Sequence, residues 1–296
     1  MSDNNGTGRR AFLTVVGGAA GMSALSSTAM AQTNAEYSEY ETDSGISVEH
    51  IDRYSTGAYD EGAAEIPAYA PDAERLFVVN GNDPAIDVLT LNADNELVQE
   101  SNITFSGGKE STNISVRKID GTEVLAAAVL ADPTTDPGEI VFWDATDLSE
   151  LARVTVGAHP DMVKFTDNGD YVLTADEGEP DDGTNPTGSV TIVDISSVDF
   201  SVSSPSGFTT NTADFTGYDG QESSLRDRGI RIYGQNSAST SEDLEPEYIA
   251  TADGKAYVTL QENNALAIID ITSASVEELK PLGYKDFSQA KNALDA

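Results

Sequence analysis

A β-rich segment that recurs along the chain constrains the fold more than any other feature. The stretch PEYIATADGKAYVTLQENNALAIIDI, from Pro246, aligns with segments that begin at Pro67, Asn113 and Pro160. Each copy has a short strand pattern, a tight turn, a second apolar strand pattern, a polar loop and a third strand pattern, and a weaker fourth one follows. The starts at 67, 113 and 160 are 46 and 47 residues apart. Four strands in about 45 residues is the period of a β-propeller blade.

The repeat therefore predicts an all-β propeller of four-stranded blades, with about four blades present. We expect blades near residues 66–105, 113–156, 160–203 and 246–282, with a polar insertion between blades at 204–243. A β-sandwich would explain the alternation of apolar residues but not the regular period. The segment ISVEHIDRY, from Ile46 to Tyr54, has the pattern of one more strand, suited to completing the last blade of a ring. Ring closure removes exposed sheet edges.

The N-terminus has the features of a twin-arginine signal peptide over residues 1–31. Arg9 and Arg10 precede a Gly/Ala-rich apolar stretch, and small residues at Ala29 and Ala31 suit cleavage before Gln32. An uncleaved N-terminal anchor is the alternative, although glycines and serines weaken the segment as a membrane span. Residues 32–45 would form a flexible acidic linker and 46–296 the propeller. We expect an exported protein, extracellular or at the cell surface, with no membrane span in its mature chain.

The charge balance excludes several kinds of partner. The chain of 296 residues has 51 Asp plus Glu against 16 Lys plus Arg, a formal net charge of −35. Nucleic acid is not an expected partner, because a molecule this acidic is repelled by polyanions at long range. Acidic residues spread along the whole chain are typical of a halophile, and at molar salt a Debye length of about 3 Å largely removes the self-repulsion. No cysteine is present, which excludes disulfides and thiolate metal sites.

Carboxylates gather in loops that would meet at one end of a propeller channel. Ca²⁺ takes about six to eight hard oxygens, which carboxylates from several loops can supply. The spacing does not match an EF-hand loop, so this would be a site assembled across blades. The alternative is the solvated acidic surface of a halophilic protein. The candidate metal ligands are Glu65, Glu177, Glu179, Asp181, Glu245, Glu247 and Glu262.

Histidine and arginine are rare in this chain, so we consider them as candidate ligand-binding residues. His159 precedes the start of a blade, where it is either a ligand or a turn residue bonded to the backbone. Arg226, Arg228 and Arg231 in LRDRGIRIYG could hold an anion such as phosphate, or pair with neighbouring acids. Asn102 and Asn113 begin glycosylation sequons, of which Asn102 is the better candidate because Asn113 sits at the start of a blade. No organic cofactor is indicated.

Several motifs together resemble one known family. The runs VGAHPDMVKFTDNGDYVLTADEGEPDD, LRDRGIRIYG, DLEPEYIA and VTLQENNALAIIDI look like the choice-of-anchor I family of exported YVTN/LVIVD-like propellers, some labelled mesenchyme-specific cell surface glycoprotein-like. The likeness covers nearly all of the mature chain. It implies a ring that is usually seven-bladed, so this chain would be its N-terminal part, with missing C-terminal blades as one partner. More distantly, the family is similar to propeller phosphatases and phytases, whose metal ions sit at carboxylates near the channel.

Two functions of different classes follow from these observations. The first is a non-enzymatic binding or scaffold module of the cell surface, stabilised by calcium, whose partner is an unknown surface ligand or envelope component. The second is a metal-dependent phosphoesterase, in which a divalent ion polarises a phosphoryl oxygen and activates water. Nucleophile signatures are missing, since no G-x-S-x-G elbow occurs.

Overall fold

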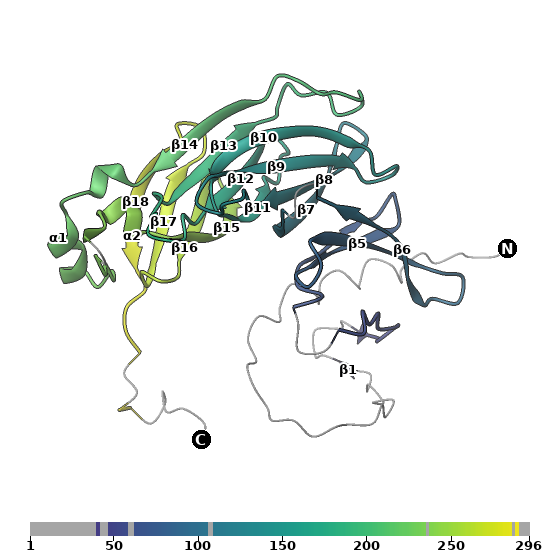
Figure 1. Ribbon diagram of the computed structural model, residues 1–296, viewed down its shortest axis with the longest axis horizontal. Coiled ribbons are helices and arrows are strands. Elements are labelled where there is room, and N and C mark those ends of the chain that lie inside the picture. Colours follow the sequence, from purple (N-terminus) through teal and green to yellow (C-terminus); the bar gives the residue numbers. More distant parts are fainter. Residues whose placement is uncertain are drawn as a thin grey trace.

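The computed structural model describes residues 40–41, 47–58, 62–105, 109–234, 237–285 and 288–289. Within them the chain forms four antiparallel sheets of four strands each. The sheets follow one another along an arc, from the blue first sheet to the yellow fourth sheet (Figure 1). Every one of these sheets is ordered in space as it is in sequence. The predicted β-propeller fold with four blades is thus confirmed.

The strand bounds give each blade the same plan. The first sheet holds β3 (Pro67–Ala70), β4 (Arg75–Asn80), β5 (Ala85–Leu91) and β6 (Leu97–Thr104). The second holds β7 (Ser111–Ile119), β8 (Thr122–Val129), β9 (Pro137–Asp144) and β10 (Glu150–Ala158). The third holds β11 (Pro160–Phe165), β12 (Tyr171–Asp176), β13 (Ser189–Asp194) and β14 (Thr209–Asp214). The fourth holds β15 (Pro246–Ala252), β16 (Lys255–Leu260), β17 (Ala265–Asp270) and β18 (Ser275–Pro281).

Turn chemistry fixes the register of the innermost hairpins. Between β7 and β8, Asp120 and Gly121 have φ of 47° and 97°. Between β15 and β16, Asp253 and Gly254 have φ of 50° and 75°. Two consecutive residues with positive φ make a type I′ turn, whose twist matches that of the flanking strands. The Asp-Gly pairs of the repeat are therefore what allows the first two strands of these blades to pair.

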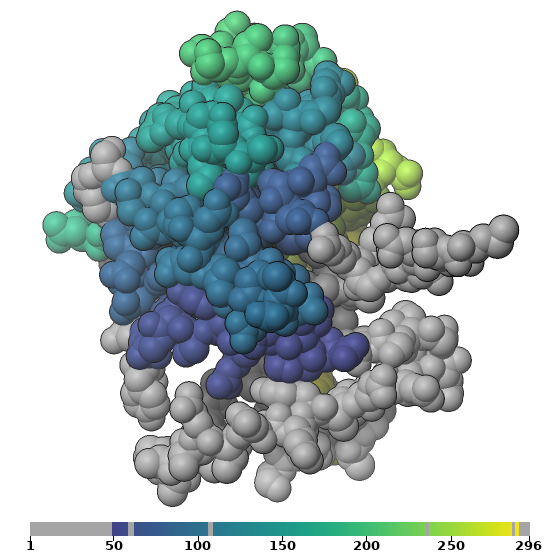
Figure 2. All heavy atoms as spheres, turned by 90° about the vertical axis from the view of Figure 1, so that its right-hand side faces the viewer, coloured from purple at the N-terminus to yellow at the C-terminus, as the bar shows by residue number. Residues whose placement is uncertain are grey.

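Three apolar cores lie between successive sheets and hold the arc together. Trp143 and Phe105 meet edge to face, with ring centroids 6.0 Å apart, in the core between the first and second sheets. Phe142 packs against Phe165 and Phe200 between the second and third sheets. Because the middle sheets are covered on both faces, strands such as β8 are almost continuously apolar. Figure 2 shows the packed sheets from the side of the first two, coloured from purple-blue at the bottom to green at the top.

The structure moves one predicted boundary. The third blade was expected to end at residue 203, but its outer strand is β14 (Thr209–Asp214), which pairs with β13 inside the expected insertion. This strand has no alternating apolar pattern in the sequence, because it consists mostly of polar Thr and Asn residues whose side chains are exposed at the edge of the sheet. The insertion proper therefore follows β14 and contains the 3₁₀ helix η4 (Thr216–Tyr218), α1 (Glu222–Asp227) and α2 (Thr240–Asp243).

The extra N-terminal strand is shorter than expected and pairs elsewhere. Of the segment 46–54, only β2 (Ser47–Val48) is a strand, and it pairs with β1 (Tyr40–Glu41) instead of joining a blade. Residues beyond it contact the edge of the first sheet, where Asp52 accepts a hydrogen bond of 2.7 Å from the Leu97 N–H. The predicted signal peptide, residues 1–31, lies outside the described residues, as does the linker 32–45 apart from β1.

Candidate functional site

Acidic side chains from two neighbouring blades gather at one end of their innermost strands. Pro160 at the start of β11 pairs with Asp176 at the end of β12, and Pro246 at the start of β15 pairs with Leu260 at the end of β16. Strand β11 lies beside β15. Because successive turns of an antiparallel sheet alternate between its two ends, the residues around these four strand ends share one rim. We call the rim acids Asp161, Glu177, Glu179, Glu245, Glu247 and Glu262 the acidic rim.

His159 lies between two carboxylates of this rim, Glu177 and Glu179. Its Nε2 lies 3.7 Å from Glu177 Oε2, and its Nδ1 lies 3.4 Å from Glu179 Oε2. The three ligand atoms that these residues offer all lie within 4.8 Å of one another. Nδ1 is buried and forms no hydrogen bond of acceptable geometry among the described residues. An imidazole between two carboxylates, with a nitrogen left unbonded, has the chemistry of a cation site.

The backbone around His159 is strained and held from both sides. His159 has φ of 50°, a left-handed conformation that a non-glycine residue adopts at a cost of order 1 kcal/mol. Its carbonyl accepts a hydrogen bond of 2.9 Å from the Glu177 N–H, and the Ala158 carbonyl accepts one of 3.1 Å from the Gly178 N–H. These two bonds extend the pairing of β11 with β12 past the strand ends. They hold Glu177 near the imidazole, where its Oε2 lies 3.7 Å from Nε2.

Burial and mutual repulsion raise the pKa values of the rim carboxyl groups. The pKa of Glu177 rises to about 8, first because of burial and then because Asp161, Glu179, Glu247 and Glu245 lie near. Burial followed by the charge of Glu262 raises the pKa of Glu245 to about 7. The pKa of Glu247 also rises to about 7, through burial and the charge of Asp161. So much negative charge around one histidine favours any cation that enters.

The carboxylate oxygens and the imidazole nitrogen of this group suit a divalent ion that accepts both oxygen and nitrogen ligands. Glu177 and Glu179 supply hard oxygens of the kind that Ca²⁺, Mg²⁺ and Mn²⁺ prefer. The imidazole of His159 is a better ligand for Mn²⁺, Fe²⁺ or Zn²⁺ than for Ca²⁺, which takes oxygen almost exclusively. The charges of Asp161 and Glu245 both help to raise the pKa of Glu247, so these three carboxyl groups lie near one another and would add oxygens or charge.

Three of the predicted metal ligands, Asp181, Glu262 and Glu65, do not belong to the group around His159. Asp181 is exposed and forms an isolated β-bridge with Thr184 in the loop after β12. Glu262 is half exposed, and its Oε2 lies 3.7 Å from Arg231. Glu65 precedes the first blade, where its backbone N–H bonds to the Val79 carbonyl at 3.1 Å, and its charge helps raise the pKa of Tyr248 on β15. Of the seven candidates, Glu177 and Glu179 meet around His159.

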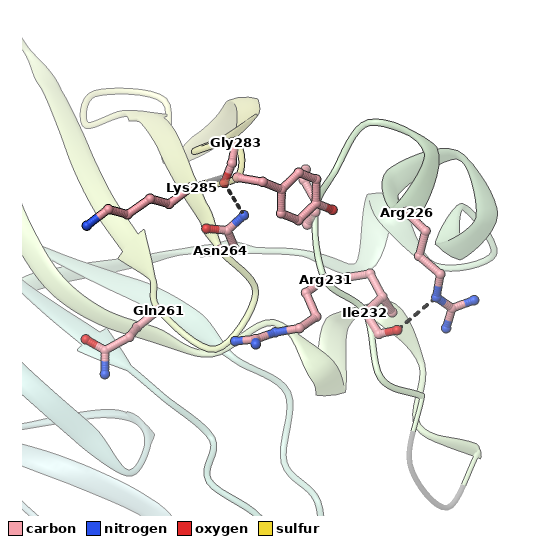
Figure 3. A pocket seen from close by; sticks show the side chains of 9 residues that line it. Arg226, Arg231, Ile232, Gln261, Asn264, Gly283 and Lys285 are labelled. Carbon is pink, nitrogen blue, oxygen red and sulfur yellow. Dashed lines mark hydrogen bonds between the residues drawn. The ribbon is translucent and has the colours of Figure 1, made fainter. Parts of the chain in front are cut away.

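The three predicted ligand-binding arginines bond mainly to backbone carbonyls. Arg226 Nε donates a hydrogen bond of 2.8 Å to the Ile232 carbonyl, as Figure 3 shows. Arg228 donates to the Leu279 carbonyl, and Arg231 donates to the Glu262 carbonyl. Arg231 also forms the loose ion pair with Glu262 and lies 5.2 Å from the centroid of the Tyr233 ring. Arg226 and Arg231 line one pocket, whereas Arg228 points elsewhere.

Three residues in the motifs of the rim prove to be structural. Asp176 is fully buried, and its carboxylate accepts hydrogen bonds from Thr174, Ser189 and Thr191. Asn263 is fully buried, accepts from the Glu245 N–H, and donates to the carbonyls of residues 231 and 243. Asp243 accepts from the N–H groups of residues 233 and 234. Asn263 directly follows the exposed Glu262, and no local sequence pattern marks its side chain as buried.

The two sequons have different surroundings. Asn102 is exposed on β6, the outer strand of the first blade. Asn113 is only 4% exposed, and its Oδ1 accepts a hydrogen bond of 3.4 Å from the Val163 N–H of the next blade. Its amide nitrogen is therefore out of reach of an enzyme while the protein is folded. Within the described residues, no helix is long and apolar enough to cross a membrane.

Comparison with known proteins gives a family and distant structural likenesses. A family model described as the choice-of-anchor I domain matches residues 65–296. No curated protein matches the chain. Among solved structures it is similar to a functionally unknown protein from Desulfotomaculum acetoxidans, with 15% identity, a TM-score of 0.48, and coverage of 74% of this chain and 57% of that one.

Two further structures show the same level of likeness. Hydrazine synthase from Kuenenia stuttgartiensis has 14% identity and a TM-score of 0.47, with 77% of this chain and 52% of that chain covered. The Cps50 (Swd1) beta-propeller domain of Myceliophteria thermophila has 12% identity and a TM-score of 0.47, with 77% and 58% covered. The chain spans between half and two thirds of the length of these solved structures.

Proposed function

The chain belongs to the choice-of-anchor I domain family, and from that premise we propose that it is an exported β-propeller binding or scaffold module that holds a divalent cation on its acidic rim. His159, Glu177 and Glu179 would be the protein ligands, with Asp161, Glu245 and Glu247 contributing further oxygens or charge. The bound cation would join the loops of the third and fourth blades and present a charged surface for a partner. That partner would be a surface ligand or a component of the cell envelope.

One observation carries this proposal. Three ligand atoms from His159, Glu177 and Glu179 converge within 4.8 Å of one another, and the Nδ1 atom of this histidine is buried without a hydrogen bond. A solvated acidic loop has no reason to keep the Nδ1 atom of a partly exposed imidazole buried without a hydrogen bond, because an unsatisfied buried polar atom costs about 1 to 3 kcal/mol. A cation would bond to the nitrogen and also neutralise the carboxylates.

The proposed location and habitat rest on the sequence. Export follows from the twin-arginine pattern at Arg9 and Arg10, and it agrees with the family's anchor domain. A halophilic source follows from the net charge of −35. The outward face of the fourth blade carries the half-buried Tyr257, Leu266 and Ile268. We propose that further blades, of the kind that complete a ring, pack on this face.

The alternative function is a metal-dependent phosphoesterase at the same rim. It draws support from the raised pKa of Glu247, which lies outside the group of three ligands, since a carboxyl group with a pKa of about 7 can donate a proton to a leaving group near neutral pH. The bound ion would supply Lewis acidity toward a phosphoryl oxygen. The residues of this chain would hold the ion and provide the acid.

Isothermal titration calorimetry in molar KCl tests the cation site. We expect saturable binding of Ca²⁺ or Mn²⁺ to the intact protein, weakened at least about tenfold in Glu177→Gln and Glu179→Gln. The control is Asp167→Asn, which removes one exposed charge from the opposite end of the third blade. If no divalent ion binds, or if the control weakens binding equally, the rim is ordinary acidic surface. A phosphomonoester assay with and without a chelator, on the same samples, separates the enzyme from the binding module.

A further inference from the structure

A pocket of about 550 Å³ lies between the insertion and the end of the fourth blade. Its wall combines the end of α1 and the segment that follows it, the turn between β16 and β17, and the residues after β18 (Figure 3). This volume falls within the range of small-molecule sites, about 300 to 1,000 Å³. The pocket shares none of its lining residues with the His159 group.

The charge of the pocket is opposite to that of the protein. Three cationic side chains, Arg226, Arg231 and Lys285, line it, and none of the described residues that line it is acidic. Over the whole chain, acids outnumber bases 51 to 16. An anion that approaches this molecule is therefore repelled by most of the surface, whereas the lining of this pocket offers it positive charge.

Two of the cationic side chains, Arg231 and Lys285, lie on the same side of the pocket. Figure 3 shows Arg231 and Lys285 reaching out on the side of Gln261, whereas Arg226 lies on the other side of Ile232. Arg231 is held by its bond to the Glu262 carbonyl and by the ring of Tyr233. Its contact with the Glu262 carboxylate is 3.7 Å long and half exposed, so this pairing is weak and open to competition.

The remaining wall offers both polar and apolar contacts. Asn264 Nδ2 donates a hydrogen bond of 3.0 Å to the Gly283 carbonyl, and the Leu282 N–H donates to the Asn264 carbonyl at 3.0 Å. These bonds fix the segment that carries Tyr284 and Lys285 against the turn. The Tyr284 side chain is 84% exposed at the pocket, where its ring presents an apolar face with a polar tip.

We propose that this pocket binds an anionic sugar unit, meaning a hydroxyl-rich ring that carries a carboxylate or sulfate group. Arg231 and Lys285 would hold the oxyanion, because a guanidinium matches its geometry with two parallel hydrogen bonds. The Gln261 amide would bond to sugar hydroxyl groups. Tyr284 would cover the apolar C–H face of the ring. The site needs no bound cation, so this proposal does not depend on the cation site proposed for the acidic rim.

Ligand-observed NMR on the intact chain in molar KCl, with a chelator present, tests the proposal. The probes are glucuronate, a glucose sulfate, neutral glucose and inorganic sulfate. We expect saturation transfer to the two charged sugars, with affinity at least about fivefold above that for glucose and for inorganic sulfate. Arg231→Gln and Lys285→Gln should each weaken binding at least about threefold. Lys285 follows the last strand of the fourth blade, so its substitution leaves the sheets intact.

The matched control is Arg53→Gln, an exposed arginine in the N-terminal segment beside the first blade. It should bind the charged sugars as the unmodified chain does. Equal binding of inorganic sulfate and of the charged sugars would overturn the sugar part of the proposal and leave an oxyanion site. No binding of any probe, or equal loss in Arg53→Gln and Lys285→Gln, would overturn it entirely.

Discussion

Asp176 Oδ2 accepts a hydrogen bond of 2.6 Å from Thr191 Oγ1 in the interior of the third blade. Thr174 and Ser189 donate to the same carboxylate at 2.7 and 3.0 Å, and no part of Asp176 reaches solvent. Burial raises the pKa of Asp176 to about 6, although the hydroxyl bonds act in the opposite direction. The next residue, Glu177, points to the rim instead. Two consecutive residues at the end of β12 therefore have different roles: Asp176 is structural, and Glu177 is a candidate metal ligand.

Asp176 should make the protein less stable as the pH rises through about 6. Its folded-state pKa lies above the value of 3.8 for an unperturbed group, so the folded chain binds this proton more tightly than the unfolded chain does. Its favourable contribution is complete below about pH 4 and is lost as the pH rises through about 6. We expect Asp176→Asn to flatten this dependence by about 2 kcal/mol, measured by urea unfolding across that range. An unchanged slope would contradict the assignment.

Cation affinity at the rim should increase with pH. The pKa of Glu177 is about 8 and the pKa values of Glu245 and Glu247 are about 7, so protons compete with a metal for these groups at neutral pH. We expect affinity to rise about tenfold per pH unit between about pH 6 and 7 for each proton displaced. Calorimetry in two buffers of different ionisation enthalpy would count the protons released. Affinity that stays constant across this range would show that the rim acids do not bind the ion.

Gly188 should tolerate no side chain. It stands just before β13, where a Cβ would lie 1.9 Å from the Leu244 carbonyl oxygen and 2.8 Å from Pro246. We expect Gly188→Ala to lower the free energy of unfolding by about 3 kcal/mol, because backbone of the fourth blade would have to move. Gly217→Ala is the control, since a Cβ there meets nothing within 4 Å. Denaturant unfolding of the two variants would settle the comparison, and equal effects would count against the close approach.

Most of the fold could be predicted from local sequence. Strand alternation and the Asp-Gly turns are local signals, so the blade plan follows from them without any tertiary information. Strand β14 was missed because a polar edge strand has no apolar face to mark it. The N-terminal strand was predicted to be longer than it is, because an alternating pattern does not show which strand a segment will pair with.

The site was only partly predictable for a different reason. His159, Glu177 and Glu179 are brought together by a left-handed backbone at His159 and by two bonds beyond the strand ends. Neither feature has a sequence pattern. The structural role of Asn263 also has no sequence pattern, since its hydrogen bonds join the insertion to the fourth blade only in the folded chain.

Glycosylation, if the exported protein meets the enzyme after folding, should occur at Asn102 alone. Asn102 is exposed, whereas Asn113 is 4% exposed and bonded to the Val163 N–H. Mass spectrometry of glycopeptides from the native source would locate the sugar, and Asn102→Gln should abolish the modified form. Sugar on Asn113 would mean that modification precedes folding.

Stability should also rise with salt through the screening of the acidic surface. With a formal net charge of −35, self-repulsion opposes the folded state at low ionic strength. Raising KCl from about 0.1 to about 1 M shortens the Debye length from about 10 to about 3 Å, so we expect the denaturation midpoint in urea to increase over this range. Glu177→Gln should keep this rise, because it removes at most one charge from a dispersed set. If millimolar Ca²⁺ restores full stability at low KCl, and Glu177→Gln abolishes that effect, the requirement lies in the rim rather than in general screening.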